Sequence, residues 1–286
     1  MGTIFNYIAQ AKYLASRNWI LAVNVLENAI EENPEEAILH AELAEIFISK
    51  NEFNKAIKYL KEAIRLDTKN EHFIFKLGNC YVSQKKHAKA IQTYNGIKNF
   101  IPEAIFNKAV AYNTLGKYDK AQECLDLLIE KKADIDAVYV LSFENLLMAE
   151  DFERLQNYVE PMRSRIGEHP EFNYLVGQYY YGKKNYIAAY SEFLKAKEKN
   201  YYTDVLSHFF ALTAFEIGKV QQALEILDQG IKDFPDFDFL IYDRIRINLL
   251  LKNKRKANAD LKRLKNKNSH ITKDAEMLFF SYNILK

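Results

Sequence analysis

The chain has 286 residues, of which 49% are hydrophobic and 27% are charged, and its formal net charge is +2. This composition is too apolar for a disordered chain, and the longest apolar runs fall far short of the roughly 18 to 20 residues that a membrane-spanning helix needs. Two cysteines, Cys80 and Cys124, are too few for a disulfide framework and lack the neighbouring ligands of a zinc site, so we expect buried thiols.

The first six residues lack the basic region and the long apolar core of a secretory signal. A cytoplasmic location is therefore expected. A soluble fragment of a longer or exported parent is compatible with the same pattern.

Small side chains recur at a nearly constant interval along the chain. The spacing is 34 residues, with a single step of 31 between the third and the fourth position. The eight positions, called ruler positions below, are Ala22, Ala56, Ala90, Ala121, Leu155, Ala189, Ala223 and Ala257. A fixed period near 34 indicates stacked copies of one small unit rather than one large core.

Each unit has the pattern of a helix, a short turn and a second helix. In the third unit, Leu77 and Tyr81 share one helical face, the polar residues 83–86 follow, and a second apolar stripe runs through Ala90 and Tyr94. In chain order the units are predicted at residues 3–36, 37–70, 71–101, 102–135, 136–169, 170–203, 204–237 and 238–271, with a capping helix at 272–286.

Glycine and proline mark the ends of the predicted helices. Gly116 and Gly218 stand where the first helix must end and the chain must reverse, because glycine adopts a left-handed backbone at little cost. Pro34, Pro102 and Pro235 each lie twelve residues beyond a ruler position, where proline stops a helix. The ruler alanines themselves have a packing role, because only a small side chain fits where two helices cross closely. Gly78 and Gly177 are expected to do the same on the opposing helix.

These residues resemble the tetratricopeptide-repeat family, whose 34-residue helix–turn–helix unit has a Leu-Gly pair and an aromatic residue in its first helix, Ala and a larger residue in its second, and a closing proline. The best matches are Leu77, Gly78, Tyr81, Ala90, Tyr94 and Pro102 in the third unit and Gly177, Tyr180, Ala189, Phe193 and Ala196 in the sixth. The resemblance implies an all-α fold, a right-handed α-solenoid of eight repeats.

Two places depart from the regular pattern. The 31-residue step predicts that Pro102 starts the next helix almost at once and that the stacking angle changes there. The unit at 136–169 is degenerate, with Leu155 at its ruler position, Ser142 and Phe143 in place of Leu-Gly, and Pro161 inside its second helix. A proline at that depth kinks or ends a helix, so this unit is read as a tolerated kink or as a hinge.

No motif for catalysis, a cofactor or a metal occurs in the chain. Gly-rich phosphate loops, Cys-x-x-Cys, His-Glu-x-x-His and Gly-x-Ser-x-Gly are absent from the sequence, and the six histidines are scattered over different units. We therefore expect no catalytic residues, no cofactor and no metal, and a protein that is not an enzyme.

The resemblance implies that the first helix of each unit lines a concave groove. Aromatic rings and amides at its outward positions suit a bound peptide or partner domain, because rings supply area at low entropic cost and amides pair with a backbone. The candidate groove residues are Phe75, Asn79, Phe106, Asn107, Asn113, Tyr174, Gln178, Tyr181, His208, Phe215, Tyr242 and Arg246.

One subgroup of the family grips the acidic carboxyl terminus of chaperones with a clamp of Lys, Asn and Arg side chains. Asn79 and Asn107 match its amides, but Phe75, Ala137 and Leu141 stand at its cationic places. A carboxylate there would lose its water without gaining an ion partner, so no chaperone-tail clamp is expected.

Charge is distributed unevenly along the chain. Residues 18–49 contain seven acidic residues and neither Lys nor Arg, whereas residues 252–267 contain eight basic residues and one acidic residue. The basic segment could meet nucleic acid or an anionic surface, which is the alternative to a solvated outer helix. The opposite charges of the two ends also suggest self-association.

The sequence thus favours a non-catalytic scaffold that holds a protein partner in the groove of a helical-repeat solenoid. Helical-repeat RNA binders read bases with a regular polar code along their inner helices, whereas the corresponding positions of this chain vary from aromatic to acidic to aliphatic. Nucleic acid is therefore the less favoured partner.

Overall fold

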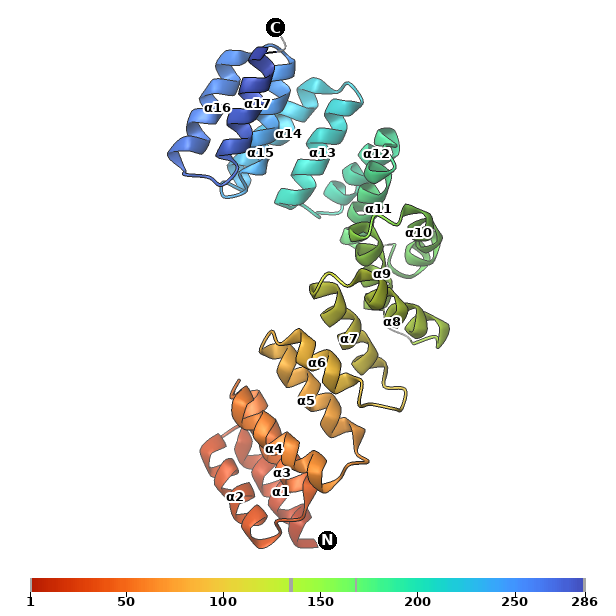
Figure 1. Cartoon of the computed structure of the whole chain (residues 1–286), viewed down its shortest axis with the longest axis vertical. Coiled ribbons are helices and arrows are strands. Elements are labelled where there is room, and N and C mark those ends of the chain that lie inside the picture. Colours follow the sequence, from red (N-terminus) through yellow and green to blue (C-terminus); the bar gives the residue numbers. More distant parts are fainter. Residues whose placement is uncertain (1, 134–135, 168, 285–286) are drawn as a thin grey trace. The chain divides into compact units, whose positions relative to one another are not determined.

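The computed structural model describes residues 2–133, 136–167 and 169–284. They form seventeen α-helices and no strand. Figure 1 labels them along the chain. Their bounds are α1 Gly2–Ala15, α2 Trp19–Glu32, α3 Ala37–Ser49, α4 Phe53–Leu66, α5 Glu71–Ser83, α6 His87–Tyr94, α7 Pro102–Thr114, α8 Tyr118–Glu130, α9 Asp136–Met148, α10 Phe152–Ile166, α11 Pro170–Gly182, α12 Tyr186–Glu198, α13 Asp204–Glu216, α14 Val220–Asp233, α15 Phe239–Leu250, α16 Lys254–Asn266 and α17 Thr272–Ile284.

Successive helices pair into hairpins, as the repeat pattern predicts. From α1 to α8 and from α10 to α16, each helix packs on the helix that follows it in the chain, both within a hairpin and from one hairpin to the next. Eight hairpins, α1–α2 to α15–α16, are followed by the single helix α17. The predicted all-α repeat fold is therefore confirmed.

The chain divides into two compact units, Met1–Asn145 and Leu146–Lys286. The division falls inside α9, the first helix of the degenerate repeat. We call them the first unit and the second unit and describe each by itself.

The ruler positions are the centres of the hairpins. All eight side chains are fully buried, including Leu155, and the larger residues four positions later, from Leu26 to Leu261, are at most 7% exposed. A methyl group added to Gly78 would overlap the ring of Tyr94, and one added to Gly177 would lie 2.5 Å from the ring of Phe193. These glycines therefore allow a large ring to pack at the helix crossing, as predicted.

The turn inside a hairpin needs one residue with a left-handed backbone, and this residue stands five positions before the ruler position of the repeat. Gly116 and Gly218 adopt φ of +68° and +79° there, as predicted. Five other repeats place a residue other than glycine in this conformation. These residues are Asn51, Lys85, Glu150, Lys184 and Lys252, with φ between 54° and 63°.

Two predicted irregularities have clear outcomes. Pro102 is the first residue of α7, and the shortened repeat before it contains α6, which has only eight residues. Pro161, which we expected to kink or end its helix, lies inside α10, and the helix continues to Ile166. Pro161 therefore does not end its helix, and the reading of this unit as a tolerated kink or as a hinge stays a prediction. As the tenth residue of α10, Pro161 removes one internal hydrogen bond, the one that its missing N–H would donate to the carbonyl of residue 157.

The last helix covers the end of the second unit. Ala275 of α17 is buried, and Leu278, Phe279 and Tyr282 pack on the core that α13 to α16 share. The sequence predicts a capping helix at 272–286, and its capping role stays a prediction; residues 285 and 286 lie outside the described part of the chain.

Candidate functional site

The surface formed by the first helices of the hairpins is the candidate site, and we call it the first-helix face. In the first unit it consists of α1, α3, α5, α7 and α9, and in the second unit of α11, α13 and α15. First helices of consecutive hairpins touch each other in both units, for example α5 with α7 and α13 with α15.

Polar side-chain pairs join each first helix of the first unit to the next one. Two pairs are ionic and two are between amides. The pairs are Lys12–Glu42 at 2.8 Å, Lys76–Glu45 at 2.6 Å, Asn107–Asn79 at 2.9 Å and Asn113–Asn145 at 3.1 Å. The three predicted asparagines of this unit are thus placed on one continuous row of pairs.

The Asn79–Asn107 pair is held in a fixed orientation by Tyr94. Oδ1 of Asn79 accepts hydrogen bonds from the Tyr94 hydroxyl at 2.6 Å and from Nδ2 of Asn107 at 2.9 Å. Burial raises the pKa of Tyr94 to about 12, so its hydroxyl remains a donor at neutral pH. Among the described residues, neither Nδ2 of Asn79 nor Oδ1 of Asn107 has a partner in the chain. The pair therefore offers one free donor and one free acceptor.

The second amide pair continues into a buried network. Asn145 is almost fully buried, and its Nδ2 donates to the Tyr118 carbonyl at 2.9 Å and to Oε1 of Gln122 at 3.0 Å. Gln122 in turn donates to Asp126 at 2.9 Å. Because Asn145 is held by this network and accepts a hydrogen bond from Asn113, it also fixes the orientation of the Asn113 side chain. Asn145 therefore has a structural role.

Two hollows lie on either side of the Lys76–Glu45 ion pair. The larger, about 410 Å³, opens among α1, α3 and α5, and the smaller, about 140 Å³, opens between α3 and α5. Glu45 and Lys76 line both hollows, and Asn79 lines the smaller one. The first-helix face of the first unit is therefore recessed next to the free amide groups.

The two predicted phenylalanines of this unit are engaged in packing. Phe75 is partly buried against the cluster around Ala90 and Tyr94, with its ring centre 6.4 Å from that of Tyr94. Phe106 packs on the cluster around Ala109 and Leu125. Both rings thus contribute to the core, which leaves only part of each exposed to a ligand.

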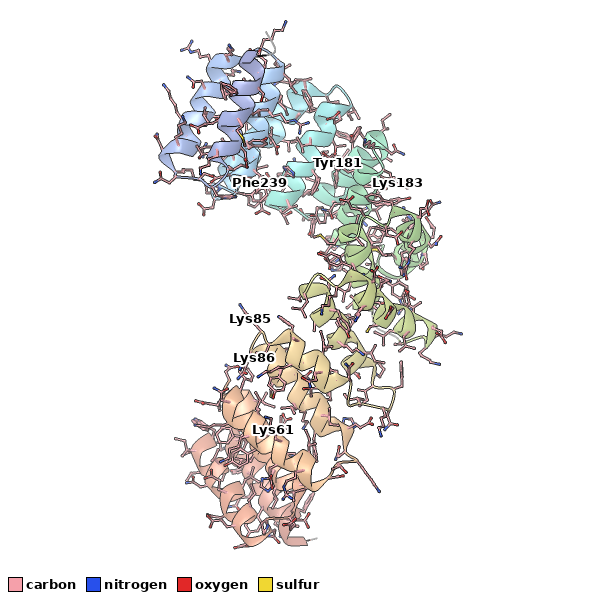
Figure 2. All side chains as sticks on the ribbon, in the orientation of Figure 1. Lys61, Lys85, Lys86, Tyr181, Lys183 and Phe239 are labelled. Atoms are coloured by element: carbon pink, nitrogen blue, oxygen red, sulfur yellow. The ribbon has the colours of Figure 1, made fainter. Side chains whose placement is uncertain are left out.

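In the second unit, the predicted residues of α11 form an aromatic group. Gln178 donates to the Tyr174 hydroxyl at 2.9 Å, and the ring of Tyr174 lies tilted against that of Tyr201 with ring centres 5.1 Å apart. Tyr181, labelled in Figure 2, meets Phe209 of α13 edge to face at 5.2 Å. Burial raises the pKa of Tyr181.

Predicted residues of α13 and α15 make polar contacts between these two helices. Nδ1 of His208 lies 2.5 Å from Oδ2 of the buried Asp243, and Arg246 reaches Glu216 at 3.9 Å. The His208 ring also lies next to Phe239, which is labelled in Figure 2. Phe215 and Tyr242 are partly buried against the core of this unit and are mainly packing residues.

The sequence reading missed Lys12, Glu42, Glu45, Asn145 and Asp243. A positional signal for such contacts exists. Glu45 and Asn79 stand eleven residues before their ruler alanines, whereas their partners Lys76 and Asn107 stand fourteen before the next ones. These two positions face each other between neighbouring repeats, so comparing them would have predicted both pairs.

No metal site is formed by the part of the chain that the structure describes. No group of three or more His, Cys, Asp or Glu side chains comes together within it, and none of its helices is long and apolar enough to cross a membrane. Cys80 and Cys124 are free and buried, and burial raises the pKa of the Cys80 thiol to about 11.

Family models agree with this architecture. Three models described as tetratricopeptide repeat match residues 12–71, 47–104 and 102–133, and the hairpins continue in the same register to residue 271. The chain is a tetratricopeptide-repeat protein.

Other tetratricopeptide-repeat proteins resemble it at low identity. The TPR repeat-containing protein MJ1428 of Methanocaldococcus jannaschii is 22% identical over 242 residues, which are 79% of this chain and 42% of that protein. The chain spans less than half the length of the curated relatives that it matches.

Solved structures share the fold. A tetratricopeptide-repeat protein from Parabacteroides merdae superposes with a TM-score of 0.66 at 18% identity, over 85% of this chain and 98% of that one. The Cut9–Hcn1 hetero-tetramer of the APC/C gives a TM-score of 0.61 at 14% identity, over 96% of this chain and 55% of that one.

Proposed function

We propose that this tetratricopeptide-repeat protein is a non-catalytic scaffold that binds an extended segment of a partner protein on the first-helix face of its first unit. The observation that carries the proposal is the free donor and free acceptor of the Asn79–Asn107 pair, next to the hollows at Glu45 and Lys76. A peptide unit has one acceptor and one donor, so the amide pair is complementary to it.

The charges of this face indicate the kind of segment that fits. Lys12 is paired with Glu42 and Lys76 with Glu45, so the cationic and anionic groups near the hollows neutralise each other. A strongly charged peptide would have to break these pairs. We therefore expect a segment of low net charge whose backbone pairs with the amides and whose small or apolar side chains enter the hollows.

The similarity to the Cut9–Hcn1 hetero-tetramer supports a role in protein assembly, since that fold occurs there together with another protein chain. This similarity supports only the class of function. The binding surface and the type of bound segment are inferred from the side-chain contacts of this chain.

The test starts with peptides selected on the wild-type protein from a displayed random library. Their affinities are then measured by calorimetry for the wild type and for Asn79→Ala with Asn107→Ala. Loss of two hydrogen bonds of about 0.5–1.5 kcal/mol each predicts binding weaker by about five- to 150-fold.

A matched control is available in the same unit. Gln84 and Asn54 form another amide pair between neighbouring hairpins, at 2.9 Å; Asn54 is exposed and Gln84 is half-buried. Gln84→Ala with Asn54→Ala should leave the affinity unchanged. If the Asn79 and Asn107 variant bound every selected peptide as tightly as the wild type, the assignment of this face would be wrong.

A further inference from the structure

The first repeat exposes a position that is buried in every later repeat. Phe5 of α1 has 72% of its surface exposed, whereas its counterparts are at most 4% exposed. These counterparts are Leu39, Phe73, Ala104, Val138, Phe172, Leu206 and Leu240. In later repeats the second helix of the preceding hairpin covers this position: Phe73, for example, packs with Ala63 of α4. No described helix lies over Phe5, so a packing surface between repeats is uncovered there.

Two further large apolar side chains of the first hairpin are exposed. Tyr13, two turns along α1, is exposed and carries the Arg17 guanidinium 3.9 Å from its ring centre. Leu21, exposed at the start of α2, stands just before the ruler alanine, where five of the other repeats have Lys or Arg. We call Phe5, Tyr13 and Leu21 the first-repeat face.

At the other end of the chain, α17 has an uncovered apolar stripe. Its inner side packs on α15 and α16, but Met277 and Phe280 point away from this core, with 60% and 67% of their surfaces exposed. They stand three residues apart and therefore share one side of the helix. We call them the last-helix face.

The hairpins that carry these two faces have opposite charge. Exposed glutamates of α2 and the following turn include Glu31 and Glu35, and residues 18–49 contain neither Lys nor Arg. Helix α16, which packs on α17, exposes Lys262 and Arg263 among its many basic residues. Its one acidic residue, Asp260, is already bound to Arg244.

We propose that the partner of the first-repeat face is the last-helix face of a second copy of this chain. Helix α17 of one copy would pack on α1 of the next copy, in the same way that α2 packs on α3 and α4 packs on α5 within the chain. Because α16 packs on α17 and α2 packs on α1, the same contact brings basic side chains close to acidic ones. The contact joins two different surfaces, so it is head to tail and generates rings or open chains of copies.

The contact is small, which determines how it must be measured. A stable protein–protein interface buries about 1,200–2,000 Å² of accessible surface in total. One helix packed on one hairpin buries less surface than this, so we expect reversible association. Sedimentation velocity over a concentration series should show the average mass rise with concentration. Raising the salt should reverse this rise, because charges on exposed side chains are screened.

Two variants that each lack one face make the test specific. Phe5→Glu with Tyr13→Glu removes the first-repeat face, and Met277→Glu with Phe280→Glu removes the last-helix face; all four side chains are exposed, so folding should be retained. Each variant alone should be monomeric, and an equimolar mixture should form a one-to-one dimer, since one intact face of each kind remains. Ile187→Glu, at a residue of α12 that is 77% exposed, is the matched control and should assemble like the wild type.

Several results would overturn the proposal. A wild-type mass that stays monomeric at all concentrations in low salt would do so. So would a dimer formed by either variant alone, which would indicate a symmetric contact. Binding of α16 to duplex DNA or RNA, with no self-association, would assign the basic segment to nucleic acid.

Discussion

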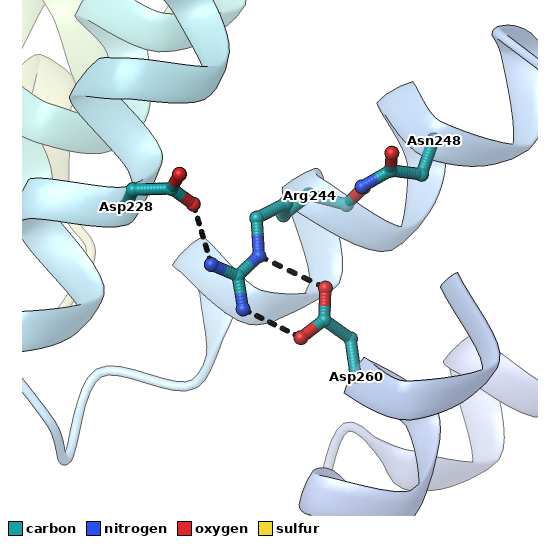
Figure 3. Close-up of polar contacts among 4 residues, drawn as sticks. All are labelled: Asp228, Arg244, Asn248 and Asp260. Atoms are coloured by element: carbon teal, nitrogen blue, oxygen red, sulfur yellow. Dashed lines mark hydrogen bonds and ion pairs between the residues drawn. The ribbon is translucent and has the colours of Figure 1, made fainter. Parts of the chain in front are cut away.

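Arg244 of α15 binds both carboxylate oxygens of Asp260 on α16, through Nε at 2.9 Å and Nη2 at 2.5 Å (Figure 3). Its Nη1 donates to Asp228 of α14 at 2.5 Å, so one guanidinium joins three helices. The equivalent residues of the preceding repeat are apolar: Phe210 occupies the position of Arg244, and Ile226 occupies the position of Asp260. The last repeat thus replaces an apolar contact with an ionic one.

This replacement predicts that single and combined variants differ strongly in their free energy of unfolding. Arg244→Ala leaves Asp260 buried without a cation, so the free energy of unfolding should fall by about 3–5 kcal/mol. Urea denaturation followed by circular dichroism measures this change.

The combined variant copies the preceding repeat. Arg244→Phe with Asp260→Ile and Asp228→Leu installs the residues that stand 34 positions earlier, and its stability should equal or exceed that of the wild type. A combined variant as unstable as Arg244→Ala would show that the apolar set of one repeat does not fit the other.

Gly78 and Tyr94 predict a second pair of variants. Gly78→Ala places a methyl group against the Tyr94 ring and should lower the free energy of unfolding by about 1–3 kcal/mol through overpacking. The second repeat has Ala44 and Leu60 at the corresponding positions.

Tyr94→Leu should therefore rescue Gly78→Ala, since it recreates the combination found in the second repeat. Thermal unfolding of the two single variants and the double variant gives the coupling energy. Strict additivity of the two changes would contradict the packing argument, because residues in contact at a helix crossing must couple.

The repeat period predicted the fold because the same packing problem is solved eight times. One buried small residue per hairpin was visible as Ala22 or Ala257, and even Leu155 kept its place in the register. In that repeat a large residue, Phe143, stands where five of the seven other repeats have Gly or Ala, and the smaller Val159 stands opposite. At this helix crossing the large volume of one side chain is matched by the smaller volume of the facing one. Such compensation is not visible from one sequence position alone.

The candidate site was harder to predict, since its contacts join neighbouring repeats. Asn79 and Asn107 were identified one by one as groove residues, but their mutual hydrogen bond depends on the register of two first helices. The aromatic residues Phe75 and Phe106 look outward by helical spacing, and yet a ring is long enough to fold back onto the core.

The hairpin turns provide a third prediction. Lys184 has φ of +57°, a conformation that costs a residue with a side chain about 1–2 kcal/mol, so Lys184→Gly should raise the melting temperature. Lys183, labelled in Figure 2, precedes it with φ of −73°, where glycine gains nothing and adds chain entropy to the unfolded state.

Lys183→Gly is therefore the matched control and should lower the melting temperature. Calorimetry of the two variants next to the wild type measures both shifts. Equal shifts of the same sign would mean that the left-handed backbone of Lys184 is not a source of strain.

The buried carboxylate of Asp243 predicts how stability depends on pH. Burial raises its pKa above the ordinary value of 3.8, and the hydrogen bond with His208 and the charge of Arg246 only partly offset this effect. A group with a raised pKa stabilises the fold below its unfolded pKa, and this contribution is lost as the pH rises through the folded pKa. Relative to Asp243→Asn, which stays neutral, the wild type should therefore lose stability as the pH rises from about 4 toward neutral.

Asp238, just before α15, is the control with the opposite sign. Burial by itself raises its pKa, but hydrogen bonds from Lys267 and Ser269 outweigh burial and hold the pKa below its ordinary value. Relative to Asp238→Asn, the wild type should lose stability only as the pH falls below about 3.8. Urea denaturation of both variants and the wild type across this pH range measures the two slopes. If the Asp243 slope had the sign of the Asp238 slope, the hydrogen bond with His208 would outweigh the cost of burying the carboxylate.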